Sequence, residues 1–311
     1  MPQLRSLIYR VMNPTMSKVH ISTPELEKCG ISYEEFYRVL FVIVKHKVHH
    51  LRVLQPSQAI ENIQAYPLII IDKIIKLFET LHTVITYNKD YVASNILLRS
   101  LADQISSLLL IYSETDEEIK ALRHYLFIID GIKGRLNQLT TEIPYDGKIK
   151  SEEFEALKTQ IKSAIDNYNG AYTFSIAEIS KLSINTKHST VIAKLIKECN
   201  WRFKSLSSTK TNTYKWKELY AFLKLPIDSA FFSLLSEFVH GLSTSNLIFE
   251  DNDITSFEAI SSIGASLLGK LDKTIDLLFS EEVPLIKPLM ISALTDPFLP
   301  QTYIDYIKQT I

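Results

Sequence analysis

Four consecutive segments between residues 32 and 139 repeat apolar side chains at helical spacing. Each is about 20 to 25 residues long and is followed by a short polar turn. The chain of 311 residues contains only 8 glycines and 11 prolines, although average usage is about 7% and 5%. Because few residues favour turns, the elements should be long. The sequence therefore predicts an all-α fold, a multi-helix bundle of long antiparallel helices with a second helical part packed against it.

The first two segments show why helices are expected. Ser32 is followed three residues later by Glu35, which is the spacing of a capping box, and Pro56 ends the first pattern. The second segment contains the run LIIIDKII, whose isoleucines favour a strand. Asp72 and Lys73 interrupt any alternation there, and the apolar positions continue at helical spacing. We predict a helix.

Proline, aspartate and glycine come together in TTEIPYDGKIK, residues 140–150, where we place a junction between two parts. The predicted organisation is an N-terminal segment without sustained periodicity (1–30), a helical bundle (31–145) and a second helical part packed on it (146–311). Within the last part we expect a helix over 151–170 and a less regular region over 171–213. Three further helices are expected around 228–241, 254–280 and near Gln301.

Charge and cysteine content narrow the classes of partner and compartment. The net charge of -1 gives no global attraction to nucleic acid or to an acidic membrane. Cys29 and Cys199 make neither a disulfide framework nor a zinc or redox motif, which fits a reducing cytoplasm. No apolar run has the length of a signal peptide or of a membrane span. We expect a cytoplasmic protein that needs no cofactor and has no membrane partner.

Arg99 and Asp103 lie in NILLRSLADQISSLLLIY, a segment that is apolar on all sides. The two residues are four apart, so they share one face of the predicted helix and can pair. One interpretation is a structural salt bridge between helices. The other is a site in which Arg99 presents its planar fork to a phosphate or carboxylate and Asp103 holds it in place.

His240 ends a second unusual helix, IDSAFFSLLSEFVHGLSTS, for which Asp228 is the predicted N-cap. Its face carries Glu237 and three serines but neither lysine nor arginine, so this face either meets another helix or lines a polar groove. A histidine in a last helical turn is also stabilised as a cation by the helix dipole. His240, Arg99, Asp103 and Glu237 are the candidate catalytic residues, although a capping role for His240 remains the plainer interpretation.

The segments RSLADQISSLLLIY, WKELYAFL and LLSEFVHGLS resemble a group of uncharacterised bacterial all-helical proteins with a domain of unknown function. That resemblance implies an all-helical fold but no particular activity. A more distant similarity is to HEPN-type helical domains, which are often ribonucleases or toxin components with an Arg-x4-6-His motif. This chain departs from the motif, because no arginine lies five to seven residues before His240. Arg99 would have to contact the phosphate from another helix.

The segment from Lys181 to Lys224 contains ten lysines or arginines but only two acids, and aromatic residues lie between them. This composition is typical of surfaces that hold phosphates and stack bases. It is equally typical of a solvated basic surface whose aromatics anchor a loop-rich segment to the core. The candidate nucleic-acid-binding residues are Lys197, Arg202, Lys204, Lys215, Trp216 and Lys217.

In HKVHH, His46 and His50 lie one helical turn apart, as in HxxxH metal sites, with His49 beside them. Lys47 occupies the position of the HExxH glutamate, and the sequence names no third ligand, so we assign no metal-binding residue. A solvated cationic helix end explains the same pattern.

Three functions from different classes remain open. The first is an interaction module or defence-system component that binds a protein partner or a second copy of itself. The second is an RNA- or nucleotide-directed enzyme, a HEPN-like nuclease, in which His240 is the general acid or base and Arg99 contacts the phosphate. It requires the two residues within about 10 Å of each other. The third is a metal-binding bundle, which requires a carboxylate beside His46 and His50.

Overall fold

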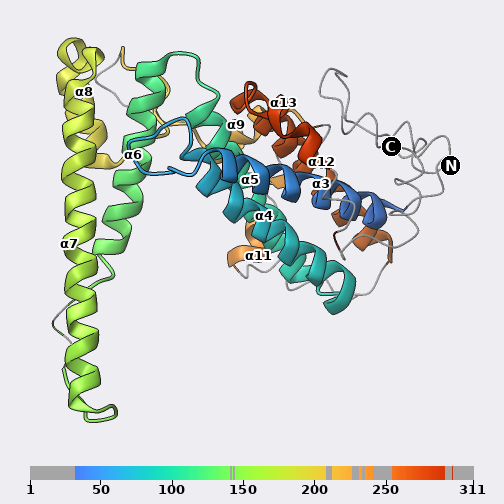
Figure 1. Ribbon diagram of the computed structural model, residues 1–311, viewed down its shortest axis with the longest axis horizontal. Coiled ribbons are helices and arrows are strands. Elements are labelled where there is room, and N and C mark those ends of the chain that lie inside the picture. The colour runs from blue at the N-terminus through green and yellow to red at the C-terminus, as the bar shows by residue number, and fades with distance from the viewer. Residues whose placement is uncertain are drawn as a thin grey trace. The chain divides into compact units, whose positions relative to one another are not determined.

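A computed structural model describes residues 32–140, 142, 144–207, 212–225, 231–232, 235–240, 254–290 and 296. For residues 237, 240 and 254–256 it gives the path of the chain only. The described residues form helices, shown in Figure 1, and an isolated β-bridge between Phe203 and Thr213. The predicted all-α fold is confirmed. The expected N-terminal segment and the helix near Gln301 lie outside the described residues.

The chain divides into two compact units. Unit 1 combines Met1–Ser113 with Lys215–Ile311, and unit 2 is Glu114–Tyr214. The predicted junction at residues 140–150 therefore falls inside unit 2 and differs from the observed boundaries. Its turn-forming residues connect two helices of one unit that pack against each other, so here they mark a helical hairpin.

Unit 1 is a helical bundle whose long helices pack through apolar faces. α3 packs against α4 and α12, and α5 packs against α4 and α12, while shorter elements lie on α5 and α3. The capping box predicted at Ser32 and Glu35 is present at the start of α3. The elements are α3 (Tyr33–Leu54), α4 (Pro67–Thr83), the π-helix η1 (Val84–Asn88), α5 (Tyr91–Tyr112), α9 (Trp216–Tyr220), the 3-10 helix η2 (Ala221–Leu223), α11 (Ser236–His240), α12 (Ile254–Leu278) and α13 (Val283–Ile286).

Helices α3 and α12 run in the same direction and approach closely. A Cβ atom at Gly264 would lie 2.9 Å from a ring carbon of Tyr37, so glycine is required at this crossing. Further along, Lys47 of α3 pairs with Asp272 and Asp276 of α12. The ends of the two helices therefore meet on the same side of unit 1.

Unit 2 contains α6 (Glu117–Leu136), α7 (Ser151–Lys181) and α8 (Ser183–Glu198), followed by the bridged hairpin. The less regular region expected over 171–213 is wrong for its first half, because α7 continues to Lys181 and α8 follows at once. The chain contains NYNG at this point, but Gly170 is exposed and nothing lies within 4 Å of the place of its missing side chain. An exposed glycine costs an α-helix only about 1 kcal/mol, which packing elsewhere offsets.

His82 on α4 is a buried histidine whose neighbours favour its neutral form. Its ring stacks on Tyr37 at 6.0 Å. Burial, followed by the positive charge of Arg38, lowers the pKa of His82 from 6.5 to about 4, although Glu34 opposes the shift. Because the pKa of His82 is lower in the folded state than in the unfolded state, the unfolded state binds a proton more readily. The contribution of His82 to the stability of unit 1 is therefore fully present above pH 6.5 and is lost as the pH falls toward 4.

We predict that His82→Phe makes unit 1 less sensitive to acid. Between pH 7 and pH 4.5, the decrease in the free energy of unfolding should be about 2 to 3 kcal/mol smaller in the variant than in the wild type. Urea denaturation of both proteins at the two pH values measures this difference. Equal decreases would show that His82 is not buried in its neutral form.

Candidate functional site

Arg99 and Asp103 form the ion pair that their spacing predicts, on α5 in unit 1. The Arg99 Nη1 atom lies 2.8 Å from Asp103 Oδ1, and the Arg99 side chain is 10% exposed. Burial lowers the pKa of the Arg99 guanidinium, while the charge of Asp103 opposes that shift. An arginine keeps its proton even so. The interior of unit 1 thus holds a charged fork next to a half-buried carboxylate.

The segment WKELY, which forms α9, covers this ion pair with aromatic rings. The guanidinium carbon of Arg99 lies 4.7 Å from the ring centre of Tyr220 and 5.8 Å from that of Trp216. Tyr220 also donates a hydrogen bond of 2.6 Å to Asp103. A carboxylate that binds both the guanidinium and the phenol, together with cation–π contact, fixes α9 on α5. We call Arg99, Asp103, Trp216 and Tyr220 the Arg99 cluster.

The other half of the predicted catalytic set falls on α11. The backbones of His240 and Glu237 belong to this helix, but both side chains lie outside the described residues, as do Asp228 and most of its neighbours. The ring of Phe238 packs on Tyr91 at 5.9 Å. Tyr91 precedes Arg99 by eight residues, which is about 12 Å along a helix axis. This contact of α11 is therefore more than two turns from Arg99, whereas Phe232, four residues before α11 begins, packs on Tyr220 of the Arg99 cluster at 5.4 Å.

The basic segment is distributed over both units. Lys197, Arg202 and Lys204 belong to unit 2, whereas Lys215, Trp216 and Lys217 belong to unit 1. Most of its aromatic rings are not free platforms for bases. Trp201 and Phe203 are buried in unit 2, and Tyr220 is buried in unit 1. These rings anchor their segments to the core. Binding of single-stranded nucleic acid requires exposed aromatic rings on which bases stack, and the basic segment meets that requirement only in part.

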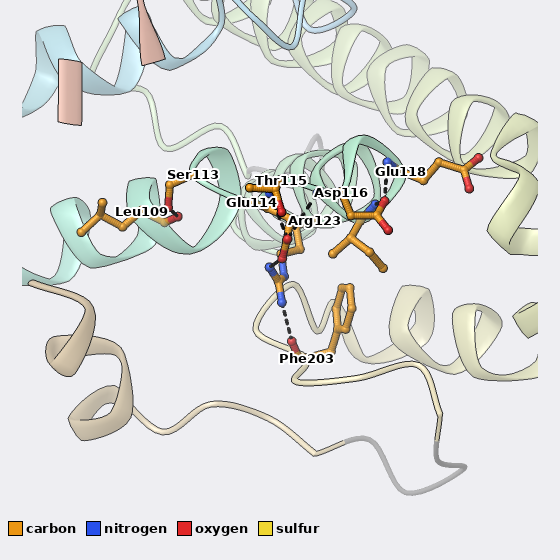
Figure 2. A network of polar contacts seen from close by, with 9 residues as sticks. Leu109, Ser113, Glu114, Thr115, Asp116, Glu118, Arg123 and Phe203 are labelled. Carbon is orange, nitrogen blue, oxygen red and sulfur yellow. Dashed lines mark hydrogen bonds and ion pairs between the residues drawn. The ribbon is translucent and has the colours of Figure 1, made fainter. Parts of the chain in front are cut away.

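Sequence reasoning missed a second buried arginine, Arg123 on α6 in unit 2 (Figure 2). Its Nη1 atom donates to Glu114 at 2.7 Å, its Nη2 atom donates to the Phe203 carbonyl at 3.2 Å, and its guanidinium lies 5.0 Å from the Phe203 ring centre. Burial lowers the pKa of Arg123, and Glu114 opposes that change. The signal was an arginine inside the apolar run ALRHYLFII, the same kind of signal as at Arg99.

The histidines of HKVHH lie near the C-terminal part of α3. His46 Nε2 is 2.9 Å from Asp296 Oδ2, so a carboxylate does lie beside one of them. The rings of His46 and His50 are 6.4 Å apart. Nevertheless, across the described ranges no group of three or more histidine, cysteine, aspartate or glutamate side chains is placed to hold a metal ion.

A surface that the sequence analysis did not identify lies at the C-terminal ends of α3 and α12, together with α13. Gln55, which follows α3, donates a hydrogen bond of 2.8 Å to Glu282, which follows α12. α13 packs on α3, and His50 hydrogen-bonds the backbone of Leu289. Five aliphatic side chains at this end are between 41% and 66% exposed. This surface, which we call the apolar end, comprises Val53, Leu54, Leu277, Leu285 and Leu289.

The sequence carries a weak signal for the apolar end. Val53 and Leu54 lie in the last turn of a predicted helix, before Pro56. From the sequence alone, such apolar residues are expected to be buried on the face of the helix that packs against the core. Only the structure shows that α13 leaves these side chains uncovered.

Comparisons with known proteins were made at three levels. No protein-family model matches the chain, and neither curated proteins nor solved structures give a match. The resemblance to an uncharacterised bacterial family and the distant similarity to HEPN domains therefore remain predictions. Within the part of the chain that the structure describes, no helix is both long enough and apolar enough to span a membrane.

Proposed function

We propose that this protein is a helical interaction module and that its apolar end binds the apolar surface of a protein partner. The observation that carries the proposal is the grouping of five exposed aliphatic side chains at one end of unit 1. Single exposed leucines are ordinary in folded proteins, but several exposed aliphatic side chains where α3, α12 and α13 end favour an interaction surface. Val53 and Leu54 lie about one helical turn after His50 on α3. The hydrogen bond between His50 and the backbone of Leu289 places Leu289 near this end of α3 as well.

The chemistry of this surface favours a protein over a nucleic acid. Its side chains are aliphatic and offer no planar ring for stacking. Glu281 is exposed beside it, and Glu282 binds Gln55, so carboxylates as well as Lys287 surround the patch. A phosphate backbone requires an excess of cations, whereas an apolar patch with a mixed polar rim is the usual composition of protein interfaces.

Two alternative functions have weaker support. For a HEPN-like nuclease, Arg99 should be available to a phosphate, but its guanidinium pairs with Asp103 and lies against Tyr220. For a metal-binding bundle, the described residues offer His46 and Asp296 in contact without a third ligand in place. The Arg99 cluster is better explained as the contact that holds α9 on α5.

The test is a comparison of proteins captured by three versions of the full chain. Leu285→Asp combined with Leu289→Asp places charge on the apolar end, and we expect it to abolish capture of the partners that the wild type binds. Tyr87→Asp is the matched control, because Tyr87 is 72% exposed in η1. η1 lies near the start of α3, since Thr86 hydrogen-bonds Glu34, so this control is at the opposite end of unit 1.

The result is read by quantitative mass spectrometry after capture from cells that express the protein. Partners retained by Tyr87→Asp but lost by the double variant would support the proposal. If the double variant captures the same proteins as the wild type, the apolar end is not the binding surface. A separate incubation of RNA with the wild type and with Arg99→Ala tests the alternative, since cleavage that is lost in Arg99→Ala, with the fold intact, would favour the enzyme.

A further inference from the structure

The chain that follows α8 in unit 2 folds back on itself as a short two-stranded ribbon. The backbone of Lys204 donates a hydrogen bond of 2.7 Å to the Asn212 carbonyl, and the backbone of Tyr214 donates one of 2.8 Å to the Arg202 carbonyl. The isolated antiparallel bridge lies between these two bonds. We call residues 201–214 the hairpin. Residues that are directly opposed on such a ribbon share one of its faces, and successive residues alternate between the two faces.

The two faces of the hairpin differ in burial and in charge. Trp201 and Phe203 are only 7% and 1% exposed, so they lie on the inner face. Arg202 is half-buried and Lys204 is exposed, and both alternate with the buried rings. Tyr214 lies opposite Arg202, and the ammonium group of Lys204 is 5.2 Å from the centre of its ring. The outer face therefore carries two cations beside a half-buried tyrosine.

The inner face fixes the hairpin on α6. The indole of Trp201 donates a hydrogen bond of 3.1 Å to Asp130 and packs on the ring of Phe127 at 5.4 Å. The guanidinium of Arg123 binds the Phe203 carbonyl and lies against the Phe203 ring, as Figure 2 shows. A ribbon anchored by buried rings and by a buried arginine holds its outer side chains in place.

Exposed lysines of α8 add to the charge of the outer face. Lys194 and Lys197 are three residues apart on the last turns of α8, so they share one face of the helix, and both are exposed. Lys133 of α6 donates a hydrogen bond of 3.2 Å to a carbonyl in the last turn of α8. Residues 187–214 contain six lysines or arginines and one acid, Glu198. Its carboxylate is 3.8 Å from Lys194, in an exposed pair.

We propose that the outer face of the hairpin and the exposed lysines of α8 bind the phosphate backbone of a nucleic-acid duplex. The chain as a whole has a net charge of -1, so the excess of cations here is local and is complementary to a row of phosphates. The buried rings of Trp201 and Phe203 cannot stack on the bases of a single strand, which favours a duplex. Contacts to phosphates alone position a protein without reading the sequence.

The proposal narrows the set of residues that the sequence named. Lys197, Arg202 and Lys204 belong to this surface, whereas Lys215, Trp216 and Lys217 belong to unit 1. The surface lies wholly within unit 2 and is separate from the apolar end of unit 1. It therefore does not depend on the proposed function.

Fluorescence anisotropy of labelled duplexes and single strands of equal length, titrated with the full chain at several salt concentrations, tests the proposal. The wild type should bind duplexes more tightly than single strands. The logarithm of the binding constant should fall linearly with the logarithm of the salt concentration, with a slope of about -0.9 for each phosphate contacted. DNA and RNA duplexes share this chemistry. Binding of either supports the proposal, and the tighter of the two identifies the nucleic acid.

Two double variants remove cations from the surface. Arg202→Ala with Lys204→Ala, and separately Lys194→Ala with Lys197→Ala, should each weaken duplex binding by at least about ten-fold and make the salt slope shallower by about 2. The pair on α8 replaces exposed lysines with alanine, the best helix former, so it tests the surface even if the hairpin variant fails to fold. Circular dichroism verifies the fold of each variant.

Lys148→Ala with Lys162→Ala is the matched control, because it removes the same number of charges from exposed positions of unit 2. Lys162 is about 18 Å along α7 from Phe174, which packs on Tyr125 of α6. The control should bind the duplex as tightly as the wild type.

Four results overturn the proposal. The first is a wild type that binds no duplex at low salt, and the second is binding that both double variants retain. The third is a control that loses as much affinity as the double variants, which would show a general effect of charge. The fourth is poly-glutamate that competes as well as an unlabelled duplex, which would indicate an acidic protein partner. Capture of partners through the apolar end should be the same in all these variants, so the two proposals fail independently.

Discussion

Replacing Lys47 with methionine is expected to lower the free energy of unfolding of unit 1 by about 3 to 5 kcal/mol. Lys47 is 8% exposed on α3, and its ammonium group donates to Asp272 and Asp276 of α12, the latter at 2.8 Å. Asp272 is only 3% exposed. The variant leaves this carboxylate buried without its cation, and the cost of an unpaired buried charge exceeds the benefit of a good pair.

A second variant separates the charge from the packing. In Lys47→Met combined with Asp272→Leu, both buried charges are replaced by apolar side chains, and most of the lost stability should return. Asp276 remains, but its side chain is 18% exposed and can be hydrated. Urea denaturation of the three proteins at pH 7 provides the comparison. If the double variant is as unstable as Lys47→Met, methionine itself fits poorly and the charge is not the cause.

Acid should partly rescue the single variant. Burial raises the pKa of Asp272 even though Lys47 opposes the shift. A raised pKa gives stability that is present at low pH and lost as the pH rises through the folded-state value. Without Lys47 the pKa of Asp272 rises further, so in the variant this carboxyl group is protonated, and no longer a buried charge, at a higher pH than in the wild type. The difference in the free energy of unfolding between Lys47→Met and the wild type should therefore become smaller as the pH falls.

The second large effect is expected for Arg99→Ala, a loss of about 3 kcal/mol in the free energy of unfolding. The variant removes the buried arginine stem and the contact with Tyr220, and it leaves Asp103 with the tyrosine hydroxyl as its partner. Arg99→Lys keeps the charge but not the planar fork, so its loss should be intermediate.

Arg52→Ala is the matched control for Arg99→Ala. Arg52 and Asp72 approach to 2.8 Å, the same distance as Arg99 and Asp103, but the Arg52 side chain is 43% exposed. An exposed pair contributes at most about 1 kcal/mol. Thermal and urea unfolding of both variants and the wild type measures the loss in the free energy of unfolding that each substitution causes. If Arg99→Ala is as stable as Arg52→Ala, the Arg99 cluster does not hold α9 in place, and a role in binding becomes the better explanation.

The sequence predicts well those features that depend on neighbours along the chain. The capping box of Ser32 and Glu35, the helix over LIIIDKII and the pairing of Arg99 with Asp103 are all confirmed. Each depends on side chains three or four residues apart, where helical geometry fixes the distance.

Features that depend on distant segments could not be predicted in this way. The sequence around Arg99 does not indicate that this side chain contacts Trp216 and Tyr220, because these residues lie more than one hundred positions later, on α9. The continuation of α7 past Gly170 depends on contact with α6, which outweighs the local preference of glycine for turns. The apolar end was missed because hydrophobic periodicity gives the face of a helix but not what covers it.

The order in which unit 1 is assembled from the chain has a consequence for its synthesis. α3, α4 and α5 leave the ribosome first, but α12, which packs on α3 and α5, follows only after all of unit 2 has been made. At about 5 to 20 residues per second, that delay is roughly 10 to 30 s. During this interval the nascent α3 carries Lys47 without its carboxylates and Tyr37 without Gly264, whereas all segments of unit 2 are complete before α12 is made. Unit 2 can therefore finish folding during translation, whereas unit 1 must wait for its C-terminal part, Lys215–Ile311, and is the part that needs protection from aggregation until then.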